Sequence, residues 1–560
     1  MTAPDPANPL IVQGDHTLLL EVDHPRYPAC RDELARFAEL VKSPEHVHTY
    51  RVTPLSTWNA CASGMGADAI VDSLCRYSKY AVPKHVTVEI RDVASRYGRL
   101  RIEWRGEELI LAAQDEALAR EVGAQRTVAP FLNQGDGPTV FAVAPGDRGR
   151  IKQALIKIGF PVEDLAGYTE GEGLELSLRP VTLGGAHFRL RPYQEGAARV
   201  FHAAGGVRGG SGVIVLPCGA GKTMVGMACM VAVQAFTLVL ATNVTAVRQW
   251  ISELLDKTTL GEDQIGEYTG QAKDIRPVTV STYQIMTYRR DREGEFEHMR
   301  LFDEREWGLI IYDEVHLLPA PVFQMTAGLQ ARRRLGLTAT LVREDGREDD
   351  VFALIGPKKV DVPWKELEHD GWIARAACTE IRVPLPESLR MPYAVADKRS
   401  KFRIACENPR KTPIVRDLMG RHGQDRILIM GMYVEQVRDI AAALGVPVIT
   451  GSTSQKKRDR LFEDFRQGAL RVLAVSKVGN FSVDLPDASV ALQISGTFGS
   501  RQEEAQRLGR ILRPKAGANQ AHFYTIVSHD TTEQGFALKR QLFLCEQGYE
   551  YRIEHADEAV

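Results

Sequence analysis

The chain contains no Cys-x-x-Cys pair, and its eight cysteines are scattered, which excludes a zinc ribbon or a four-cysteine cluster. No apolar run is long enough to span a bilayer, and the first residues lack a secretory pattern. Internal repeats and low-complexity segments are also missing from the sequence. The formal net charge is only -2, so a nucleic-acid-binding surface would have to be local. These absences predict a cytoplasmic protein without a membrane segment.

The composition is that of an ordinary globular protein. Hydrophobic residues make up 44% of the 560 positions and charged residues 25%. The length predicts about three or four domains. We expect an N-terminal α+β domain over residues 1–85, a second small unit over 86–178, and two larger units over 179–370 and 371–560. In the two larger units strands and helices alternate, so the predicted fold class is α/β with two parallel sheets.

Local patterns give finer expectations for the N-terminal part. Residues 10–22 are predicted to form a strand pair that turns at Gly14 and Asp15. Residues 30–41 have helical spacing, and residues 86–90 are predicted to be a strand. Neither small unit carries a catalytic signature.

The most informative stretch reads Val-Ile-Val-Leu-Pro-Cys-Gly-Ala-Gly-Lys-Thr over residues 213–223. Its four leading apolar residues are typical of a buried parallel strand. Gly219 and Gly221 allow a tight turn that aims several N–H groups at one point, before an apolar helix. The pattern departs from the full Walker sequence at Leu216, where a glycine is expected.

This loop and helix start suit a polyphosphate. Lys222 would reach the β- and γ-phosphates, and the Thr223 hydroxyl would bind Mg²⁺. A disulfide at Cys218 would be hard to accommodate in such a loop, which favours a reducing cytosol. The predicted phosphate-binding residues are Pro217, Cys218, Gly219, Ala220, Gly221, Lys222 and Thr223.

A second segment, Leu-Arg-Pro-Tyr-Gln194, precedes the loop. The amide of Gln194 can donate to and accept from the adenine edge at once, which would favour ATP over GTP. Arg191 belongs to the same segment and is assigned to the nucleotide with it.

An acidic pair follows another apolar strand, in Trp-Gly-Leu-Ile-Ile-Tyr-Asp-Glu-Val-His316. Functional residues of parallel sheets gather at the carboxyl ends of strands. Asp313 would hold Mg²⁺ opposite Thr223, and Glu314 would orient and polarise the attacking water. His316 is predicted to link the nucleotide to the next strand. Thr338, at the end of that strand, can bridge the carboxylates to nearby groups.

The second large unit has no phosphate loop but ends in Gln-Arg-Leu-Gly-Arg-Ile-Leu-Arg513. Arg510 and Arg513 are three residues apart, so both leave the same face of a helix. Such arginines, reaching across a cleft, would neutralise charge on the transferring phosphoryl group, and Gln506 is assigned with them. ATP would therefore lie at the seam between the two large units and favour their closure.

Closure and opening of the two large units would move a polymer that lies across both of them. Hydroxyl and cationic side chains at strand ends suit phosphate contacts with DNA, although each could equally cap a helix or form a turn. They are Thr242, Arg248, Thr282, Ser452, Ser476 and Lys477. The stretch Arg248 to Trp250 is predicted to be one of these contact loops. Residues 384–408 lack clear periodicity and are predicted to project as an insertion.

The order of these motifs resembles superfamily 2 helicases. It includes Leu-Thr-Ala-Thr340 between the acidic pair and the arginine segment. Four further stretches resemble, more narrowly, the XPB family of DNA repair helicases. They are residues 337–346, 451–455, 476–486 and 499–510.

The resemblance implies two RecA-like helicase domains that use ATP and Mg²⁺ on single-stranded and duplex DNA, moving three-prime to five-prime in nucleotide-excision repair. Residues 86–178 would be the family's damage-recognition domain, and residues 384–408 a thumb-like element. Arg343, Glu344 and Asp345 would form the motif tied to strand separation. Asp484 would contact the ribose. The resemblance also implies a prokaryotic, cytoplasmic, monomeric form with a nuclease as candidate partner.

The residues leave alternatives open. A double-strand translocase shares every motif, and an ATP-gated DNA remodelling or annealing factor is a second alternative. Lys222, Glu314 and Arg510 argue against a pure scaffold, because a scaffold needs no complete hydrolytic set. An RNA motor is disfavoured only by the resemblance.

Overall fold

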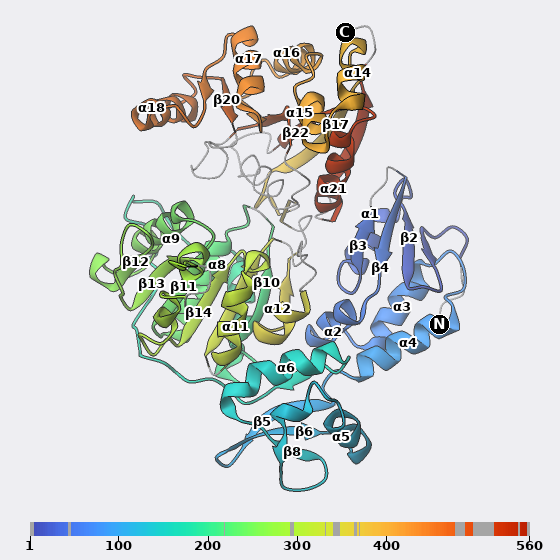
Figure 1. Cartoon of the computed structure of the whole chain (residues 1–560), viewed down its shortest axis with the longest axis vertical. Coiled ribbons are helices and arrows are strands. Elements are labelled where there is room, and N and C mark those ends of the chain that lie inside the picture. The colour runs from blue at the N-terminus through green and yellow to red at the C-terminus, as the bar shows by residue number, and fades with distance from the viewer. Residues whose placement is uncertain are drawn as a thin grey trace.

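The structure is a computed structural model that describes residues 5–42, 46–217, 219–291, 296–330, 332–339, 348–362, 367–368, 370–476, 488–496, 520–546 and 549–556. Figure 1 shows four units along the chain, with the two largest one above the other and the two smaller ones beside and below them. The positions of the boundaries between these units stay a prediction.

The N-terminal unit is a four-stranded antiparallel sheet of order β1-β2-β4-β3 with helices packed on it. The predicted strand pair is confirmed, because β1 and β2 pair antiparallel with Leu10 opposite Leu20. The strands are β1 Leu10–Val12, β2 Thr17–Glu21, β3 Glu39–Lys42 and β4 Val47–Arg51. The helices are α1 Tyr27–Leu34, α2 Pro54–Ala62, α3 Ala67–Tyr77 and α4 Lys84–Ser95.

Two local predictions in this unit need correction. Residues 86–90 are not a strand but lie inside α4. Their β-branched side chains suggested a strand, yet the buried residues are Val86, Ile90 and Ala94, four apart, which is the spacing of one helix face. The helix predicted over residues 30–41 ends earlier, because α1 stops at Leu34 and β3 begins at Glu39.

The five-stranded unit has the strand order β7-β8-β6-β5-β9. Its strands are β5 Leu100–Arg105, β6 Glu108–Ala113, β7 Asn133–Gln134, β8 Val140–Ala142 and β9 Val162–Asp164, and its helices are α5 Glu116–Gly123 and α6 Arg148–Lys157. Helix α6 packs against the next unit, where a Cβ at Gly149 would lie 2.4 Å from the carbonyl oxygen of Ala327. Glycine is therefore needed for this close approach.

The first parallel-sheet unit has seven strands in the order β12-β13-β11-β14-β15-β10-β16, all paired in parallel. Its strands are β10 Ser211–Val215, β11 Thr237–Ala241, β12 Ile265–Tyr268, β13 Val278–Thr282, β14 Leu309–Asp313, β15 Arg333–Thr338 and β16 Lys358–Asp361. Its helices are α7 Pro192–His202, α8 Lys222–Val233, α9 Val244–Lys257, α10 Tyr283–Met286, α11 Ala320–Gly328 and α12 Glu348–Leu354. The central strands are buried throughout, which explains their continuous apolar runs.

The second parallel-sheet unit also has seven strands, in the order β19-β20-β18-β21-β22-β17-β23. Its strands are β17 Arg375–Val383, β18 Ile427–Gly431, β19 Val448–Ile449, β20 Val472–Ser476, β21 Val490–Gln493, β22 Gln520–Ser528 and β23 Glu550–His555. Its helices are α14 Glu387–Val395, α15 Lys398–Cys406, α16 Lys411–Arg421, α17 Val434–Leu444, α18 Gln455–Arg466 and α21 Thr532–Glu546.

The two large sheets have the same connectivity. Counted from the first strand of each sheet, both place the third strand at one edge, followed by the fourth, second, fifth, sixth, first and seventh. The fold class predicted from the sequence is therefore confirmed, and the two halves are topological repeats. Residues 384–408, which have no clear period in the sequence, contain α14 and α15. Helix α15 buries Phe402, Ala405 and Cys406. A thumb-like role for this segment stays a prediction.

The N-terminal unit contacts both large units. The side-chain oxygen of Asn59 on α2 accepts a hydrogen bond from the Lys358 N–H at 2.9 Å. On the other side, Cys545 of α21 is only 3% exposed and belongs to the core of the N-terminal unit. In Figure 1, α21 reaches down toward α1 and β3. The N-terminal unit thus bridges the two parallel sheets.

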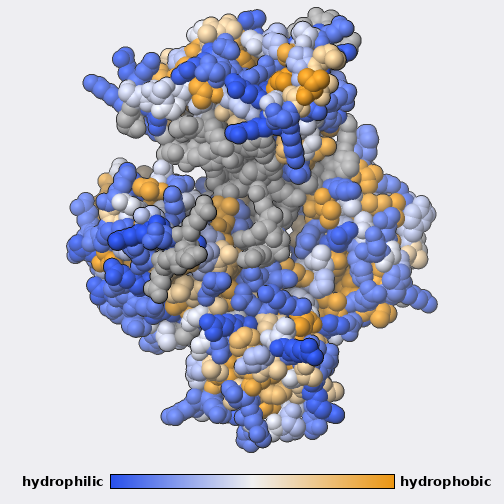
Figure 2. Space-filling model, in the orientation of Figure 1, coloured by the Kyte–Doolittle hydropathy of each residue, from blue (hydrophilic) through white to orange (hydrophobic). Residues whose placement is uncertain are grey.

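The surface is hydrophilic over most of the visible face of the first parallel-sheet unit, and hydrophobic residues are interspersed over the five-stranded unit below it (Figure 2). Within the residues that the structure describes, every helix is too short or too polar to traverse a bilayer.

Candidate functional site

The glycine loop lies at the carboxyl end of β10, as the sequence predicts. Gly219 and Gly221 have φ angles of 82° and 80°, in the left-handed region that favours glycine. A Cβ at Gly221 would also lie 2.7 Å from Nε2 of Gln194, so a side chain here would displace the Gln194 amide. Helix α8 begins directly afterwards at Lys222, which places its amino-terminal N–H groups beside the loop.

The segment before the loop holds the loop in place. Gln194 is 3% exposed, and its Nε2 donates to the carbonyl oxygen of Ala220 at 3.0 Å. The Tyr193 hydroxyl donates to the same oxygen at 2.6 Å. The Oε1 atom of Gln194 accepts a hydrogen bond from the Arg191 N–H at 2.9 Å. Gln194 therefore positions the loop, and its contact with adenine stays a prediction.

Arg191 connects this segment to the linker between the two large sheets. Its Nη1 donates to the carbonyl oxygen of Trp372 at 3.1 Å, and its guanidinium lies 4.9 Å from the centroid of the Trp372 ring. A cavity of about 330 Å³ lies here, and it is lined by Pro192, Tyr193, Val362, Leu367, Asp370 and Trp372. Sequence reasoning did not assign Trp372 to the site, because its partner is 181 residues away.

Lys222, Glu314 and His316 meet at the carboxyl edge of the first sheet. Nζ of Lys222 lies 3.1 Å from Oε1 of Glu314. Nδ1 of His316 lies 3.6 Å from Oε2 of Glu314 and 2.7 Å from the Thr338 hydroxyl oxygen. Glu314 has a φ of 51°, a left-handed conformation uncommon for this residue type that turns the chain at the strand end. His316 therefore lies between the Glu314 carboxylate and the end of β15, and its link to the nucleotide stays a prediction.

The Asp313 carboxylate accepts a hydrogen bond from Trp250, a residue that the sequence analysis assigns to a DNA-contact loop. Nε1 of Trp250 donates to Oδ2 of Asp313 at 2.9 Å, and the Tyr283 hydroxyl donates to the backbone oxygen of Asp313 at 2.8 Å. Trp250 is 1% exposed, so the prediction that it contacts DNA is wrong. Its spacing with Val247 and Leu254 on α9 was the available signal, because it marks one buried helix face.

The pKa values of Asp313 and Glu314 are shifted in opposite directions. Desolvation raises the pKa of Asp313 to about 6, the Glu314 carboxylate adds to this rise, and the Trp250 hydrogen bond opposes it. Burial also acts to raise the pKa of Glu314, but the Lys222 ammonium and then His316 outweigh it and lower that pKa below its usual value. At neutral pH both side chains are ionised, with Glu314 the more strongly held in that form.

The residues present fit a magnesium nucleotide. Asp313 at the end of β14 and Thr223 in the first turn of α8 carry side-chain oxygen atoms that could bind Mg²⁺ beside the glycine loop. In the described part of the chain no three His, Cys, Asp or Glu side chains form a metal-holding cluster. A cation at this site would complete its shell with phosphate oxygens and water, which is the usual habit of Mg²⁺.

Several predicted residues lie outside the described residues. They are Cys218, Arg343, Glu344, Asp345, Lys477, Asp484, Gln506, Arg510 and Arg513, and Thr340 of the third motif. Their assigned roles stay predictions.

Of the remaining predicted DNA contacts, Arg248 lies within α9, and Thr242, Thr282, Ser452 and Ser476 lie at or just beyond the carboxyl ends of strands in the two large sheets. Thr282 is 3% exposed and caps α10 by accepting the Ile285 N–H, the alternative that the sequence left open. Ser476 is fully buried at the end of β20. Arg248 is 59% exposed, whereas Thr242 is half-buried and Ser452 is exposed.

Three family models match separate parts of the chain. Residues 367–559 match the model described as "ERCC3/RAD25/XPB C-terminal helicase", and residues 187–343 match "Type III restriction enzyme, res subunit". Residues 10–134, which include the N-terminal unit, match "Helicase conserved C-terminal domain".

Similar proteins extend the match over all four units. A protein of Kineococcus radiotolerans named "DNA 3'-5' helicase XPB" is 54% identical over 551 residues, covering 98% of this chain and 97% of that protein. A protein of the same name from Mycobacterium tuberculosis is 53% identical, covering 99% and 98%. In Antonospora locustae, the "General transcription and DNA repair factor IIH helicase/translocase subunit XPB" is 34% identical, covering 97% and 81%.

Proposed function

The chain belongs to the XPB family of helicases, and from this premise we propose that it is an ATP-dependent DNA helicase that opens duplex DNA in nucleotide-excision repair. The direction of movement proposed is three-prime to five-prime, in keeping with the names of the two bacterial relatives. The observation that carries the proposal is the convergence of Lys222, Asp313, Glu314 and His316 beside a glycine loop at one sheet edge.

Each of these residues has a separate proposed role in ATP hydrolysis. Bound ATP and Mg²⁺ would supply the phosphoanhydride and the cation that offsets its charge. Thr223 and Asp313 would hold Mg²⁺, and the ammonium of Lys222 would bind phosphate oxygens. Lys222 pairs with Glu314 in this structure at 3.1 Å, so its transfer to phosphate would release the Glu314 carboxylate to accept a proton from water.

His316 would connect the Glu314 carboxylate to the next strand, β15. Its Nδ1 lies within reach of both Glu314 and the hydroxyl of Thr338. Because Thr338 ends β15, a change in charge at Glu314 would act on the strand end that precedes Arg343, Glu344 and Asp345 in the chain. We assign these three residues to strand separation.

The second parallel-sheet unit would complete the site on closure. We propose that Arg510 and Arg513, with Gln506, neutralise charge on the transferring phosphoryl group, and that Asp484 binds the ribose. Arg191 and Trp372 would couple this closure to the base-binding segment, because they join α7 to the linker between the sheets. Thr242, Arg248, Ser452 and Lys477 would face the DNA backbone, whereas Thr282 and Ser476 are buried in this structure. We further propose a cytoplasmic monomer that works with a nuclease.

The first test is the variant Lys222→Ala. We expect ATP turnover to be abolished while DNA binding is largely kept, because Lys222 is assigned to phosphate and is not among the predicted DNA contacts. ATPase rates with and without single- and double-stranded DNA, and DNA affinity by fluorescence anisotropy, measure the two effects. Lys157→Ala, an exposed lysine on α6, is the matched control. Equal loss of turnover and DNA binding would contradict the assigned role.

The second test separates unwinding from translocation. The wild-type protein should separate a duplex that carries a three-prime single-stranded tail and leave a five-prime-tailed duplex intact. Displacement of a triplex strand without separation of either duplex would instead favour the double-strand translocase. Failure of ATP hydrolysis to respond to any DNA would contradict both.

A further inference from the structure

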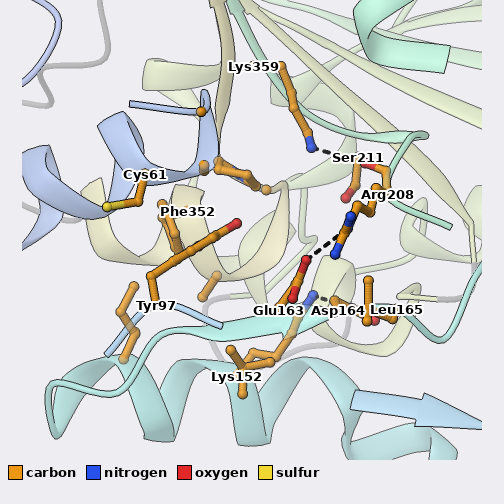
Figure 3. Close-up of a pocket in the computed structure, with 17 residues that line it drawn as sticks. Cys61, Tyr97, Lys152, Glu163, Asp164, Leu165, Arg208, Ser211, Phe352 and Lys359 are labelled. Carbon is orange, nitrogen blue, oxygen red and sulfur yellow. Dashed lines mark hydrogen bonds and ion pairs between the residues drawn. The ribbon is translucent and has the colours of Figure 1, made fainter. Parts of the chain in front are cut away.

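A cavity of about 280 Å³ lies where three units meet, away from the glycine loop (Figure 3). Helix α2 of the N-terminal unit, β9 of the five-stranded unit, and β10, α12 and β16 of the first parallel-sheet unit contribute to its wall. It opens beside Ser211, the first residue of β10, whereas the glycine loop follows the last residue of that strand. The cavity and the nucleotide site are thus at opposite ends of the same strand.

Lys359 is the cation in this cavity that has no acidic partner. Its Nζ donates to the carbonyl oxygen of Arg208 at 3.0 Å, and among the described residues no carboxylate oxygen lies within 4.0 Å of it. A Cβ at Gly212 would lie 2.4 Å from Cγ of Lys359, so the lysine stem rests on bare backbone and directs the ammonium inward. One of its three N–H donors is used, and two remain for a ligand.

The acids near the cavity are already engaged by other cations. Asp164 is paired with Arg148 at 2.7 Å and with Lys152 at 2.8 Å. Glu163 is paired with Arg208 at 3.0 Å and lies 3.7 Å from Arg101. The two carboxylates therefore have four cationic side chains around them, and Lys359 is a fifth cation in addition to these. Burial lowers the pKa of Lys359, the Glu163 carboxylate opposes this fall, and the Arg208 guanidinium adds to it.

Two hydroxyl groups add uncharged donors to the same space. Tyr97 points into the cavity in Figure 3, and burial raises its pKa to about 12, so it remains a neutral donor near pH 7. The Ser211 oxygen accepts a hydrogen bond from the Tyr168 hydroxyl at 2.7 Å, which leaves the Ser211 hydrogen free to donate elsewhere. Cations and hydroxyl donors without acceptors are the chemistry that recognises an oxyanion.

We propose that this cavity binds a small phosphate-type oxyanion of about the size of pyrophosphate, held by Lys359, Arg208, Tyr97 and Ser211. The ligand would join the segment between α4 and β5, which carries Tyr97, to the first parallel-sheet unit, which carries Arg208, Ser211 and Lys359. The site is distinct from the nucleotide site and does not depend on hydrolysis there. It would make the arrangement of the N-terminal units sensitive to a small anion.

The test must exclude the glycine loop, which would also bind pyrophosphate. Isothermal titration calorimetry with pyrophosphate, without Mg²⁺ and at constant ionic strength, is therefore made on Lys222→Ala. We expect this variant to keep one binding event. Adding Lys359→Met should weaken it by about tenfold or more, the loss expected for one charge-assisted hydrogen bond. Adding Lys157→Met, an exposed lysine on α6, should leave it unchanged.

Absence of a binding event on Lys222→Ala, or equal affinity with and without Lys359→Met, would overturn the proposal. If circular dichroism shows that the Lys359→Met protein does not fold, Tyr97→Phe and Arg208→Gln on the same background decide the question. Each should weaken binding, and unchanged affinity in both would overturn the site. Repeating the titration with adenosine monophosphate shows whether a free oxyanion or a phosphate ester is preferred, and Lys359 should be required for either.

Discussion

At the scale of single residues, the site depends on side chains that adjust the charge of others. Trp250 is a clear case, because its indole N–H is the hydrogen-bond donor to the Asp313 carboxylate and supports the ionised form. Burial works in the opposite direction and raises the pKa of Asp313 to about 6. Since a protonated Asp313 is a poor ligand for Mg²⁺, activity should fall as the pH drops through this range.

Removing the indole donor should shift the pH at which activity falls on the acidic side of the pH profile, called here the acid limb. In Trp250→Phe the carboxylate loses a hydrogen bond worth about 1.5 kcal/mol, which corresponds to a pKa rise of about one unit. Because the pKa rises, the fall in kcat/KM for ATP should begin at higher pH. The measurement is kcat/KM between about pH 5 and pH 8 at a fixed Mg²⁺ concentration.

The matched control is Trp58→Phe, whose indole donates to the backbone oxygen of Val93 in the N-terminal unit. This variant should leave the acid limb of the wild-type profile in place. An identical limb in Trp250→Phe would show that the hydrogen bond does not govern the ionisation of Asp313.

The ion pair between Lys222 and Glu314 leads to a second prediction at this scale. In Glu314→Gln the group that orients water is lost, so kcat should fall by about 10² to 10⁴. ATP affinity should stay equal or improve, because Lys222 no longer has a carboxylate competing with phosphate at 3.1 Å. Equilibrium binding of a fluorescent ATP analogue, beside steady-state hydrolysis, separates the two quantities. Weaker nucleotide binding would argue against the competition.

At the scale of elements, close packing of α8 against α9 holds Trp250 in position. A Cβ at Gly226 on α8 would lie 2.4 Å from Cη2 of Trp250. Glycine costs about 1 kcal/mol of helix propensity relative to alanine, and overpacking a core costs about 1 to 3 kcal/mol. The packing term is therefore the larger, and it explains why a helix interior carries glycine here.

Two glycine-to-alanine variants test this comparison. Gly226→Ala should lower the free energy of unfolding by about 1 to 2 kcal/mol and reduce ATP hydrolysis, since the displaced indole contacts Asp313. Gly535→Ala on α21, where a Cβ would meet nothing within 4 Å, should raise stability by up to about 1 kcal/mol. Denaturant titration measures both. A stabilising effect of Gly226→Ala would show that the Trp250 indole can move aside without an energetic cost.

At the scale of the whole molecule, the N-terminal unit connects two parallel sheets that share one topology. It contacts β16 through α2 and reaches α21 through Cys545, which is buried in its core. A change in the angle between the two sheets must therefore be accommodated at one of these contacts. The contact with the second sheet includes Cys545 near the end of α21 and Tyr551 of β23.

A buried charge should open this contact. Cys545→Asp places a carboxylate in an apolar core, at a cost of several kcal/mol unless the contact separates. We expect a larger radius of gyration by small-angle X-ray scattering and an earlier, separate unfolding step. Leu538→Asp lies on the same helix, where Leu538 is 43% exposed, and should change neither. An unchanged radius in Cys545→Asp would show that the contact does not hold the units together.

Much of the site was predictable because its signals are local. The glycine loop, the acidic pair and the strand alternation each occupy a short stretch whose backbone requirements appear in neighbouring residues, as at Gly221 and Asp313. The error at residues 86–90 has a local cause as well. There β-branched composition favoured a strand, while the four-residue spacing of Val86, Ile90 and Ala94 indicated the helix that forms.

The sequence by itself determined the order of the chemical groups along the chain, the two parallel sheets and the phosphate-binding turn, because these follow from the hydrophobic period and from residues adjacent in the chain. Only the tertiary structure decided that Trp250 supports Asp313, that Trp372 packs on Arg191, that Cys545 enters the N-terminal core and that Lys359 meets Arg208 in a shared cavity. Such pairs come from segments far apart in the chain. Their proximity is set by how helices and sheets pack, which no local pattern records.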